Sequence, residues 1–239
     1  SKYCCFEVLK YEEDHYRAVI NCNCLQSIND DPARLEWNLL LTQDINCESI
    51  SDFTTLGGVD NEYKGIFDGQ GYSIEALSIE DDRNYIGLFS GIELEGQVKN
   101  LKFQNPIVKS SGAYTGVIAG DNQGIIKNIS IENATVENDG GSIGGLVGAN
   151  NATIENVYVT GTVTSKPSGT FLVGGIAGAN NGERGAEGVI KNSYADVAVY
   201  GDFSTGGFVG HNSGEIYASF SVGPVLKANG ATGGGFIGS

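Results

Sequence analysis

Residues 142–159 read SIGGLVGANNATIENVYV, and this stretch decides the fold because variants of it recur along the chain. Tyr114 begins the copy YTGVIAGDNQGIIKNISI, and Ser204 begins the copy STGGFVGHNSGEIYASFSV. One glycine aligns in every copy: Gly91, Gly120, Gly148, Gly178, Gly210 and Gly238. These six anchor glycines are separated by 29, 28, 30, 32 and 28 residues. A period of this length is typical of repeat architectures in which each copy packs on the next.

Each copy consists of short apolar segments that are broken by Gly and Asn. In the second copy these segments are residues 116–120, 125–131 and 134–136, and β-branched residues dominate them. No segment of helical length shows the 3.6-residue spacing of an amphipathic helix. Three short strands at a fixed period describe one coil of a solenoid. We therefore predict an all-β protein, a right-handed parallel β-helix of about seven coils of roughly 29 residues each.

The recurring Gly and Asn residues are predicted to be structural turn positions. Glycine adopts positive φ at a corner without a steric penalty, and Asn tolerates the same region. The expected corner residues are the six anchor glycines together with Asn100, Asn128, Asn156 and Asn192. A second column of aligned residues contains Asn122, Asn150, Asn180 and Asn212. Stacked Asn side chains can hydrogen-bond along such columns.

Composition divides the chain into two unequal parts. Only two of the 36 glycines lie in residues 1–62, whereas all five cysteines lie before residue 48. We predict a cysteine-rich N-terminal cap or assembly segment over residues 1–34 and a β-solenoid over residues 35–239. The last copy stops within a coil, so we expect the solenoid to continue in a longer parent protein or to meet another chain.

The cysteines are candidates for disulfides rather than for a metal site. They are Cys4, Cys5, Cys22, Cys24 and Cys47. No CxxC spacing is present, and His15 is the only nearby histidine, which disfavours zinc. If Cys22 and Cys24 lie on a strand, their thiols share one face. We expect two disulfides and one remaining thiol, either Cys47 buried in the first coil or a cysteine that pairs between chains.

Charge excludes several classes of partner. The chain has 14 Lys and Arg residues against 29 Asp and Glu residues, a net charge of −15. Nucleic acid and anionic lipid both require a basic surface. No apolar run reaches the length of a membrane span. We therefore expect no nucleic-acid partner and no membrane insertion. The chain lacks Met and starts at Ser1, so we expect a mature chain or an excised piece.

No catalytic set is visible in the sequence, and we expect no cofactor. The acids of the repeats are mostly isolated: Asp121, Glu132, Glu137, Asp139, Glu155, Asp196, Asp202 and Glu215. His211 occupies a predicted repeat turn without a nucleophile or an acid spaced to partner it. The one acidic cluster is Glu80, Asp81 and Asp82, beside Arg83. It is a weak candidate for surface Ca²⁺, and the alternative is a solvated acidic turn.

The repeat resembles the GLUG-motif repeats of bacterial surface and secreted proteins. The residues that carry the resemblance are Gly145-Leu146-Val147-Gly148 with Ala149-Asn150-Asn151, and Gly207-Phe208-Val209-Gly210 with His211-Asn212. It covers about residues 35–239; the cysteine-rich start and the expansion at residues 183–188 depart from it. The resemblance implies a β-solenoid at an extracellular or cell-surface location. Family members include adhesin-like passengers and non-catalytic N-terminal regions of immunoglobulin A peptidases.

Three functions follow in order of preference. The first is a non-enzymatic extracellular structural or adhesive module, with a glycan or a host or cell-surface protein as partner. Exposed aromatics such as Tyr72, Tyr85 and Tyr114 could stack on sugars. The second is a subunit of a self-assembling surface filament, joined end to end by strand addition. The third is a carbohydrate-active β-helix enzyme, a polysaccharide lyase or hydrolase, which requires two acids on neighbouring coils.

Overall fold

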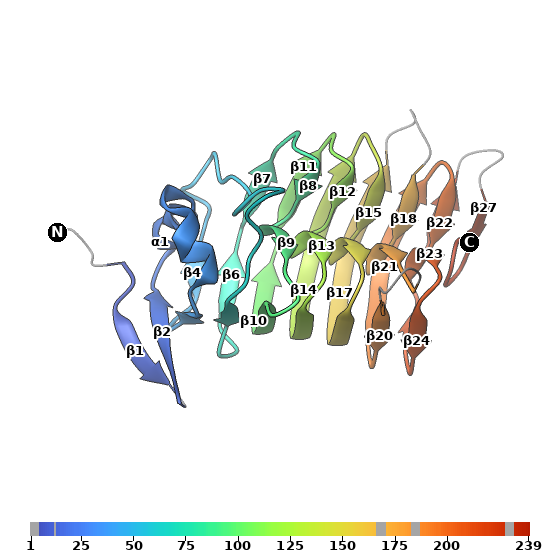
Figure 1. The fold of residues 1–239 in the computed structure, drawn as a ribbon. Helices are drawn as coiled ribbons and strands as arrows, with labels where there is room; N and C mark the ends of the chain where they lie inside the picture. Colours follow the sequence, from blue (N-terminus) through green and yellow to red (C-terminus); the bar gives the residue numbers. More distant parts are fainter. Residues whose placement is uncertain (1–4, 12, 166–170, 183–186, 228–231) are drawn as a thin grey trace.

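The chain winds into a parallel β-solenoid, as Figure 1 shows. The computed structural model describes residues 5–11, 13–165, 171–182, 187–227 and 232–239. Strands of successive coils lie side by side, in sequence order from the N-terminal end to the C-terminal end. Seven strands of the main sheet follow one another in this way from residue 39 to residue 217. The predicted all-β parallel β-helix of about seven coils is confirmed.

Three sheets form the faces of the solenoid. The first has 16 strands, and its main path is β1 (Val8–Tyr11), β2 (Asp14–Val19), β3 (Leu39–Leu41), β5 (Ile66–Asp68), β10 (Gln97–Gln104), β14 (Ile125–Asn138), β17 (Thr153–Ser165), β20 (Val189–Lys191) and β24 (Glu215–Tyr217). Its other strands are β4 (Ile45–Asn46), β6 (Ser73–Glu75), β7 (Ser78–Glu80), β11 (Ile107–Ser110), β21 (Tyr194–Gly201), β25 (Phe220–Ser221) and β26 (Val225–Lys227).

The other two sheets are built from the short strands of the glycine-rich segments. The second sheet contains β8 (Tyr85–Ile86), β12 (Tyr114–Thr115), β15 (Ser142–Gly144), β18 (Leu172–Gly174), β22 (Ser204–Gly206) and β27 (Thr232–Gly234). The third contains β9 (Phe89–Ile92), β13 (Ala119–Asn122), β16 (Val147–Asn150), β19 (Ala177–Asn180) and β23 (Val209–Asn212). The five coils between residues 66 and 212 therefore each contribute strands to all three faces.

The pairing register aligns equivalent residues of successive coils. Val98 pairs with Ile126, Ile126 with Ile154, and Ile154 with Ile190. All four side chains are completely buried. Each column of this kind forms a continuous apolar stack inside the solenoid, where burial of apolar surface supplies the main stabilisation. The core is thus one cluster that runs along the solenoid axis.

The anchor glycines are not corner residues, and this part of the prediction is wrong. Five of the six lie inside β9, β13, β16, β19 and β23, and none has positive φ. A Cβ on Gly178 would lie 2.4 Å from the backbone nitrogen of Ile143, and one on Gly210 would lie 2.5 Å from that of Val173. Ile143 and Val173 belong to the second sheet of the preceding coil. Glycine is needed because the third sheet packs directly against the second, which leaves no room for a side chain.

The Asn corner residues do adopt the left-handed conformation. Asn100, Asn128, Asn156 and Asn192 have φ between 51° and 56°. The Nδ2 of Asn128 donates to Oδ1 of Asn100 at 2.8 Å, and that of Asn156 donates to Asn128 at 2.8 Å. We call these four residues the outer Asn ladder, because two of its middle members, Asn128 and Asn156, are exposed.

The second Asn column forms a buried ladder. Three hydrogen bonds of 2.8 Å join Asn122 to Asn150, Asn150 to Asn180, and Asn180 to Asn212. Asn122, Asn150 and Asn180 have no solvent exposure. We call this column the inner Asn ladder. Because their amide groups bond to each other and to nearby carbonyls, burial does not leave their polar atoms unsatisfied.

The N-terminal region joins the solenoid without following its repeat. β1 and β2 form an antiparallel hairpin, and β2 then pairs in parallel with β3. Three short helices follow β2: α1 (Cys22–Gln26), η1 (Ser27–Asp30) and η2 (Pro32–Glu36). The boundary predicted at residue 34 falls within η2. Leu25 and Ile28 of these helices are buried in the same cluster as the solenoid core.

Two disulfides fasten this region, and they correct the prediction about Cys47. Cys5 pairs with Cys24, and Cys22 pairs with Cys47. Cys47 is therefore not the remaining thiol; it joins α1 to the first coil. Cys22 and Cys24 lie on a helix rather than a strand, so their side chains point in different directions and reach different partners. Cys4 lies outside the described residues.

Candidate functional site

The structure brings two carboxylates together that look isolated in the sequence. Asp121 on β13 is in register with Gly91 on β9, and Tyr63 pairs with Ile92. Glu62 therefore lies on one side of Gly91 and Asp121 on the other. A Cβ on Gly91 would lie 2.6 Å from Oε1 of Glu62, which shows that the carboxylate of Glu62 occupies the space above this glycine.

Burial raises the pKa of both carboxyl groups of this pair. Desolvation raises the pKa of Glu62 to about 7, and the nearby charges of Asp121 and Glu93 add to the increase. Burial also raises the pKa of Asp121, although hydrogen bonds from Gln123 and Asn151 oppose the change. Perturbed carboxyl groups of this kind occur at functional sites and also in purely structural clusters. Neither group lines the two cavities described below.

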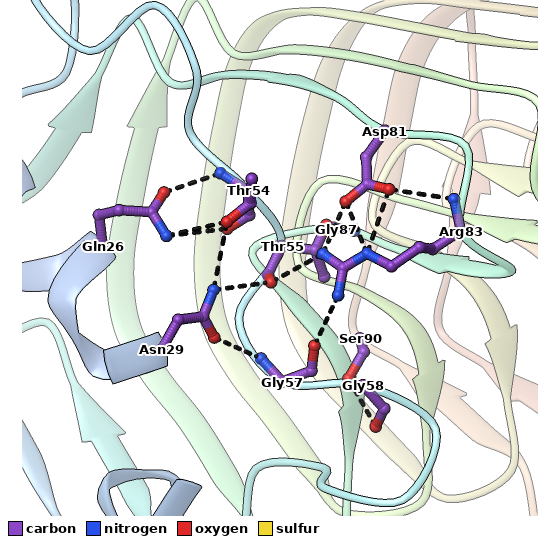
Figure 2. Close-up of polar contacts among 10 residues, drawn as sticks. All are labelled: Gln26, Asn29, Thr54, Thr55, Gly57, Gly58, Asp81, Arg83, Gly87 and Ser90. Carbon is purple, nitrogen blue, oxygen red and sulfur yellow. Dashed lines mark hydrogen bonds and ion pairs between the residues drawn. The ribbon is translucent and has the colours of Figure 1, made fainter. Parts of the chain in front are cut away.

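The candidate Ca²⁺ turn is occupied by an arginine. Figure 2 shows the guanidinium of Arg83 against the carboxylate of Asp81, with a shortest distance of 2.6 Å. The same guanidinium donates to the carbonyl oxygens of Gly57 and Thr55 at 2.9 and 3.0 Å. Asp82 accepts a hydrogen bond from Ser111. Glu80 ends β7 and is exposed.

Arg83 lowers the cation affinity of this turn. Partial burial alone would raise the pKa of Asp81, but hydrogen bonds from Arg83 and its charge outweigh burial and lower it. The charge of Asp81 is thus already compensated by Arg83. Among the described residues, no group of three or more His, Cys, Asp or Glu side chains is arranged to hold a metal ion.

The rest of this polar network ties the helical region to the solenoid. Gln26 accepts from the backbone nitrogen of Thr54 at 2.7 Å and donates to its hydroxyl at 3.0 Å. Asn29 donates to the carbonyl of Thr55 and accepts from the nitrogen of Gly57. These bonds span 26 to 28 residues. The cavity beside them, about 590 Å³, is therefore lined by groups that already bond to one another.

A groove lies on the first sheet, beside the outer Asn ladder. It has a volume of about 410 Å³. The ladder forms one wall, and the parallel row of outward-facing residues two positions later forms the other. That row contains Lys102, Ser130, Tyr158 and Tyr194. We call this feature the Asn–Tyr groove. It crosses four coils, about 14 Å at the spacing of neighbouring strands.

An aromatic stack forms the C-terminal half of the second wall. The rings of Tyr158 and Tyr194 are stacked with centroids 4.1 Å apart, and those of Tyr194 and Phe220 are 5.0 Å apart. The next coil toward the N-terminus carries Ser130 in this row. Its short side chain does not extend the stack, so the stack ends at Tyr158 and the groove is open beside that ring.

The aromatic residues expected to meet sugars lie elsewhere. Tyr85 and Tyr114 stack on each other on the second sheet, with centroids 5.0 Å apart. The side chain of Tyr72 is 37% exposed. His211 lies in β23 rather than in a turn, and its Nδ1 is 3.1 Å from the hydroxyl of Ser239. None of these residues lines the Asn–Tyr groove.

Comparison with known proteins supports the repeat assignment. The family model described as "The GLUG motif" matches residues 139–164. This segment is a GLUG motif. It runs from β15 through β16 into β17, so the motif contributes strands to all three sheets. A search of curated proteins gave no match.

A solved structure shares the fold of the whole solenoid. It is the crystal structure from Bacteroides ovatus of a "putative immunoglobulin A1 protease". The alignment has a TM-score of 0.63 and 20% identity, and it covers 93% of this chain and 71% of that chain. At this identity the likeness shows the fold alone. The activity named for the neighbour is a property of that protein.

Sequence reasoning missed two features of the candidate sites. Glu62 precedes Gly91 by 29 residues, one repeat period, but it lies before the recognisable repeats. Tyr158 follows Ser130 by 28 residues, so an alignment of the copies at this column would have shown where the aromatic stack ends. In both cases the periodicity contained the information, and the structure showed which columns face outward.

Proposed function

We propose that this chain is a non-enzymatic structural and adhesive module of an extracellular or cell-surface protein. The observation that carries the proposal is the continuous ladder of parallel strands over a single core, from β2 to β24. Each interior coil pairs with a neighbouring coil on both sides, so we expect the module to be a stiff rod. A stiff rod presents a binding surface at a fixed distance from its attachment point.

The two disulfides support the extracellular location. Disulfides form and persist in oxidising compartments and are rare in the cytosol. Cys5–Cys24 and Cys22–Cys47 both fasten the region that lacks the repeat. No helix among the described residues has the length and apolar character needed to cross a bilayer. The GLUG motif agrees with this location, because the resemblance stated above is to surface and secreted proteins.

Adhesion can be tested with beads that carry the oxidised chain in one orientation. We expect such beads to attach to glycan-coated surfaces or cultured epithelial cells, and free chain in excess to block attachment. Beads that carry an unrelated acidic protein of similar charge control for nonspecific attachment. If the chain-coated beads attach no better than the control beads, the adhesive role is wrong.

Self-association end to end is the second candidate, and the last coil favours it. Apolar side chains there are at least half exposed: Tyr217, Phe220, Val222 and Leu226. An exposed strand edge with apolar residues is a template for pairing with another chain. Light scattering over a concentration series tests this candidate. A mass that stays at 25.1 kDa would exclude it, whereas growth with concentration would support it.

If the chain is an enzyme, Glu62 and Asp121 are the candidate pair of catalytic carboxyl groups. Two carboxyl groups with separated pKa values are a common arrangement for glycoside hydrolysis. We propose that the pair is structural because neither group lines the Asn–Tyr groove or the cavity beside Arg83. Incubation with a panel of polysaccharides should release no reducing ends. Product formation that Glu62→Gln abolishes would overturn the non-enzymatic assignment.

A further inference from the structure

The open end of the aromatic stack gives the Asn–Tyr groove a free ring face. In the row Lys102, Ser130, Tyr158, Tyr194, Phe220, each residue pairs with the next in strand register. The rings of the last three are nearly parallel, with interplanar angles of 25° and 8°. One face of Tyr158 is covered by Tyr194. The other face looks over Ser130 toward Lys102, and nothing in the row covers it.

The opposite wall of the groove offers hydrogen-bonding groups along the same direction. Asn128 is exposed; it uses one N–H to reach Asn100 and one carbonyl lone pair to accept from Asn156. An amide group has two donor hydrogens and two acceptor sites, so one of each remains for a ligand. The ladder holds the amide in place. Its remaining donor and acceptor are therefore oriented before any ligand binds, which reduces the entropic cost of binding.

We infer that the Asn–Tyr groove binds a neutral glycan that crosses the solenoid axis, with one hexose ring lying over Ser130 against the open face of Tyr158. A pyranose ring has an apolar C–H face that stacks on an aromatic ring, and its hydroxyl groups pair with amides at its edge. Tyr158 supplies the ring face, and Asn128 and Asn156 supply the polar edge. The inference rests on the proposed adhesive function and names its ligand class.

Charge selects a neutral glycan over an acidic one. The chain carries a net charge of −15, and Glu132 and Asp196 lie close enough to Tyr158 to affect its pKa electrostatically. Lys102 is the only charged residue among the groove-lining side chains, and its charge interacts with Asp44. A polyanionic glycan would therefore meet repulsion at the aromatic end of the groove.

The experiment is a titration of the intact oxidised chain with defined hexasaccharides, in which calorimetry measures the binding. The probes are β-1,4-linked glucose and mannose hexasaccharides and, as the acidic comparator, a galacturonate hexasaccharide. We expect the neutral probes to bind at least tenfold more tightly than the acidic one. The inference is wrong if no neutral probe binds, or if the acidic probe binds more tightly.

Two variants test the location of the binding site, one by removing the ring face and one by blocking access to it. Tyr158→Ala removes the ring face. Ser130→Tyr fills the space in which the sugar ring lies and leaves an open face only beside Lys102, whose long side chain is next in the row. Both should weaken binding of the neutral probes at least tenfold. Tyr200→Ala is the matched control, since it removes an exposed tyrosine ring of β21 that does not line the groove; the affinity of this variant for the neutral probes should stay within twofold of the unaltered chain. Circular dichroism confirms folding, and Ser130→Tyr keeps the test decisive if Tyr158→Ala fails to fold.

The outcomes separate this inference from the proposed function. If Ser130→Tyr binds glycan as well as the unaltered chain, the groove is not the site. If the chain-coated beads attach to cells but no neutral probe binds, adhesion uses another surface and this inference alone fails. If neither attachment nor glycan binding occurs, both the adhesive role and the groove assignment are wrong.

Discussion

The first 62 residues and the coils that follow stabilise one continuous core by different means. The N-terminal region has two disulfides, three short helices and an antiparallel hairpin. Its Trp37 packs edge-on against Phe6 with centroids 5.3 Å apart, and the guanidinium of Arg17 lies 5.0 Å from the Trp37 ring. The later coils have no disulfide among the described residues and use glycine columns, Asn ladders and stacked rings instead.

This difference follows from how many neighbours each part has. A coil inside the solenoid pairs with a similar coil on both sides, so the same small contact repeats and adds up. The first coil lacks such a neighbour on one side. Covalent bonds and individually placed aromatic contacts replace the missing repeat there, as expected for a small unit with little core of its own.

Removal of both disulfides should destabilise the N-terminal region most. The crosslinks close loops with sequence separations of 19 and 25 residues, and each constrains the unfolded chain by about 3 kcal/mol. Urea unfolding with and without reductant measures the effect, with Trp37 fluorescence as a local probe. A variant with Ser at Cys5, Cys22, Cys24 and Cys47 is the control and should not respond to reductant. Identical urea-unfolding midpoints for the oxidised and the reduced chain would contradict the stabilising role of the two disulfides.

Gly178→Ala should destabilise the later coils by about 3 kcal/mol, the upper end of the range for overpacking. The new Cβ would lie 2.4 Å from the nitrogen of Ile143, and backbone cannot move aside cheaply. Gly58→Ala is the matched control, because a Cβ there meets nothing within 4 Å. Thermal unfolding of both variants measures the difference. Equal losses of stability in the two variants would mean that contact between the second and third sheets is not the reason for glycine at the anchor positions.

The two Asn ladders should differ in their sensitivity to alanine. Asn150→Ala breaks bonds with Asn122 and Asn180 and leaves buried polar groups unpaired, a loss of about 2 kcal/mol. Asn128→Ala acts at an exposed site, where water replaces the lost bonds and the main cost is the left-handed backbone, about 1 kcal/mol. Chemical denaturation of the two variants tests this order. A larger loss for Asn128→Ala would show that the corner conformation matters more than buried pairing.

Glu62→Gln should have the smallest effect, and it should depend on pH. The pKa of Glu62 is raised to about 7 in the folded chain, so the folded state holds this proton more tightly than the unfolded state. Ionisation therefore costs stability progressively from about pH 4.5 to pH 7, and the cost stays constant above that. After allowance for solvent screening we expect a gain of about 1 kcal/mol for Glu62→Gln at pH 8.

The same variant should match the unaltered chain at pH 4, where Glu62 is protonated in both states. Unfolding curves at the two pH values test this prediction. Glu155→Gln is the control, since Glu155 forms an exposed ion pair with Lys191 at 3.4 Å. A gain for Glu62→Gln that is equal at pH 4 and pH 8 would show that the raised pKa is not its cause.

The fold was predictable because the same pattern of short strands and turn residues occurs in every repeat. A period of about 29 residues, β-branched segments and aligned Asn residues lead to a parallel solenoid from the printed sequence alone. The prediction for Cys47 failed because pairing depends on how α1 turns its two cysteines, and a five-residue helix in a region without repeats leaves little trace in the sequence. The anchor glycines were placed at corners because glycine at a fixed spacing looks the same whether it relieves backbone strain or a steric contact.

The sequence by itself determined the local and periodic properties of this protein: strand content, coil length, the columns that stack and the acidic charge. These depend on residues at fixed separations along the chain. Tertiary structure alone decided which faces touch and which columns open to solvent. It placed Glu62 beside Asp121, Arg83 against Asp81, and the bare face of Tyr158 over Ser130. Such contacts join different coils and sheets, and their geometry is fixed only when the whole core packs.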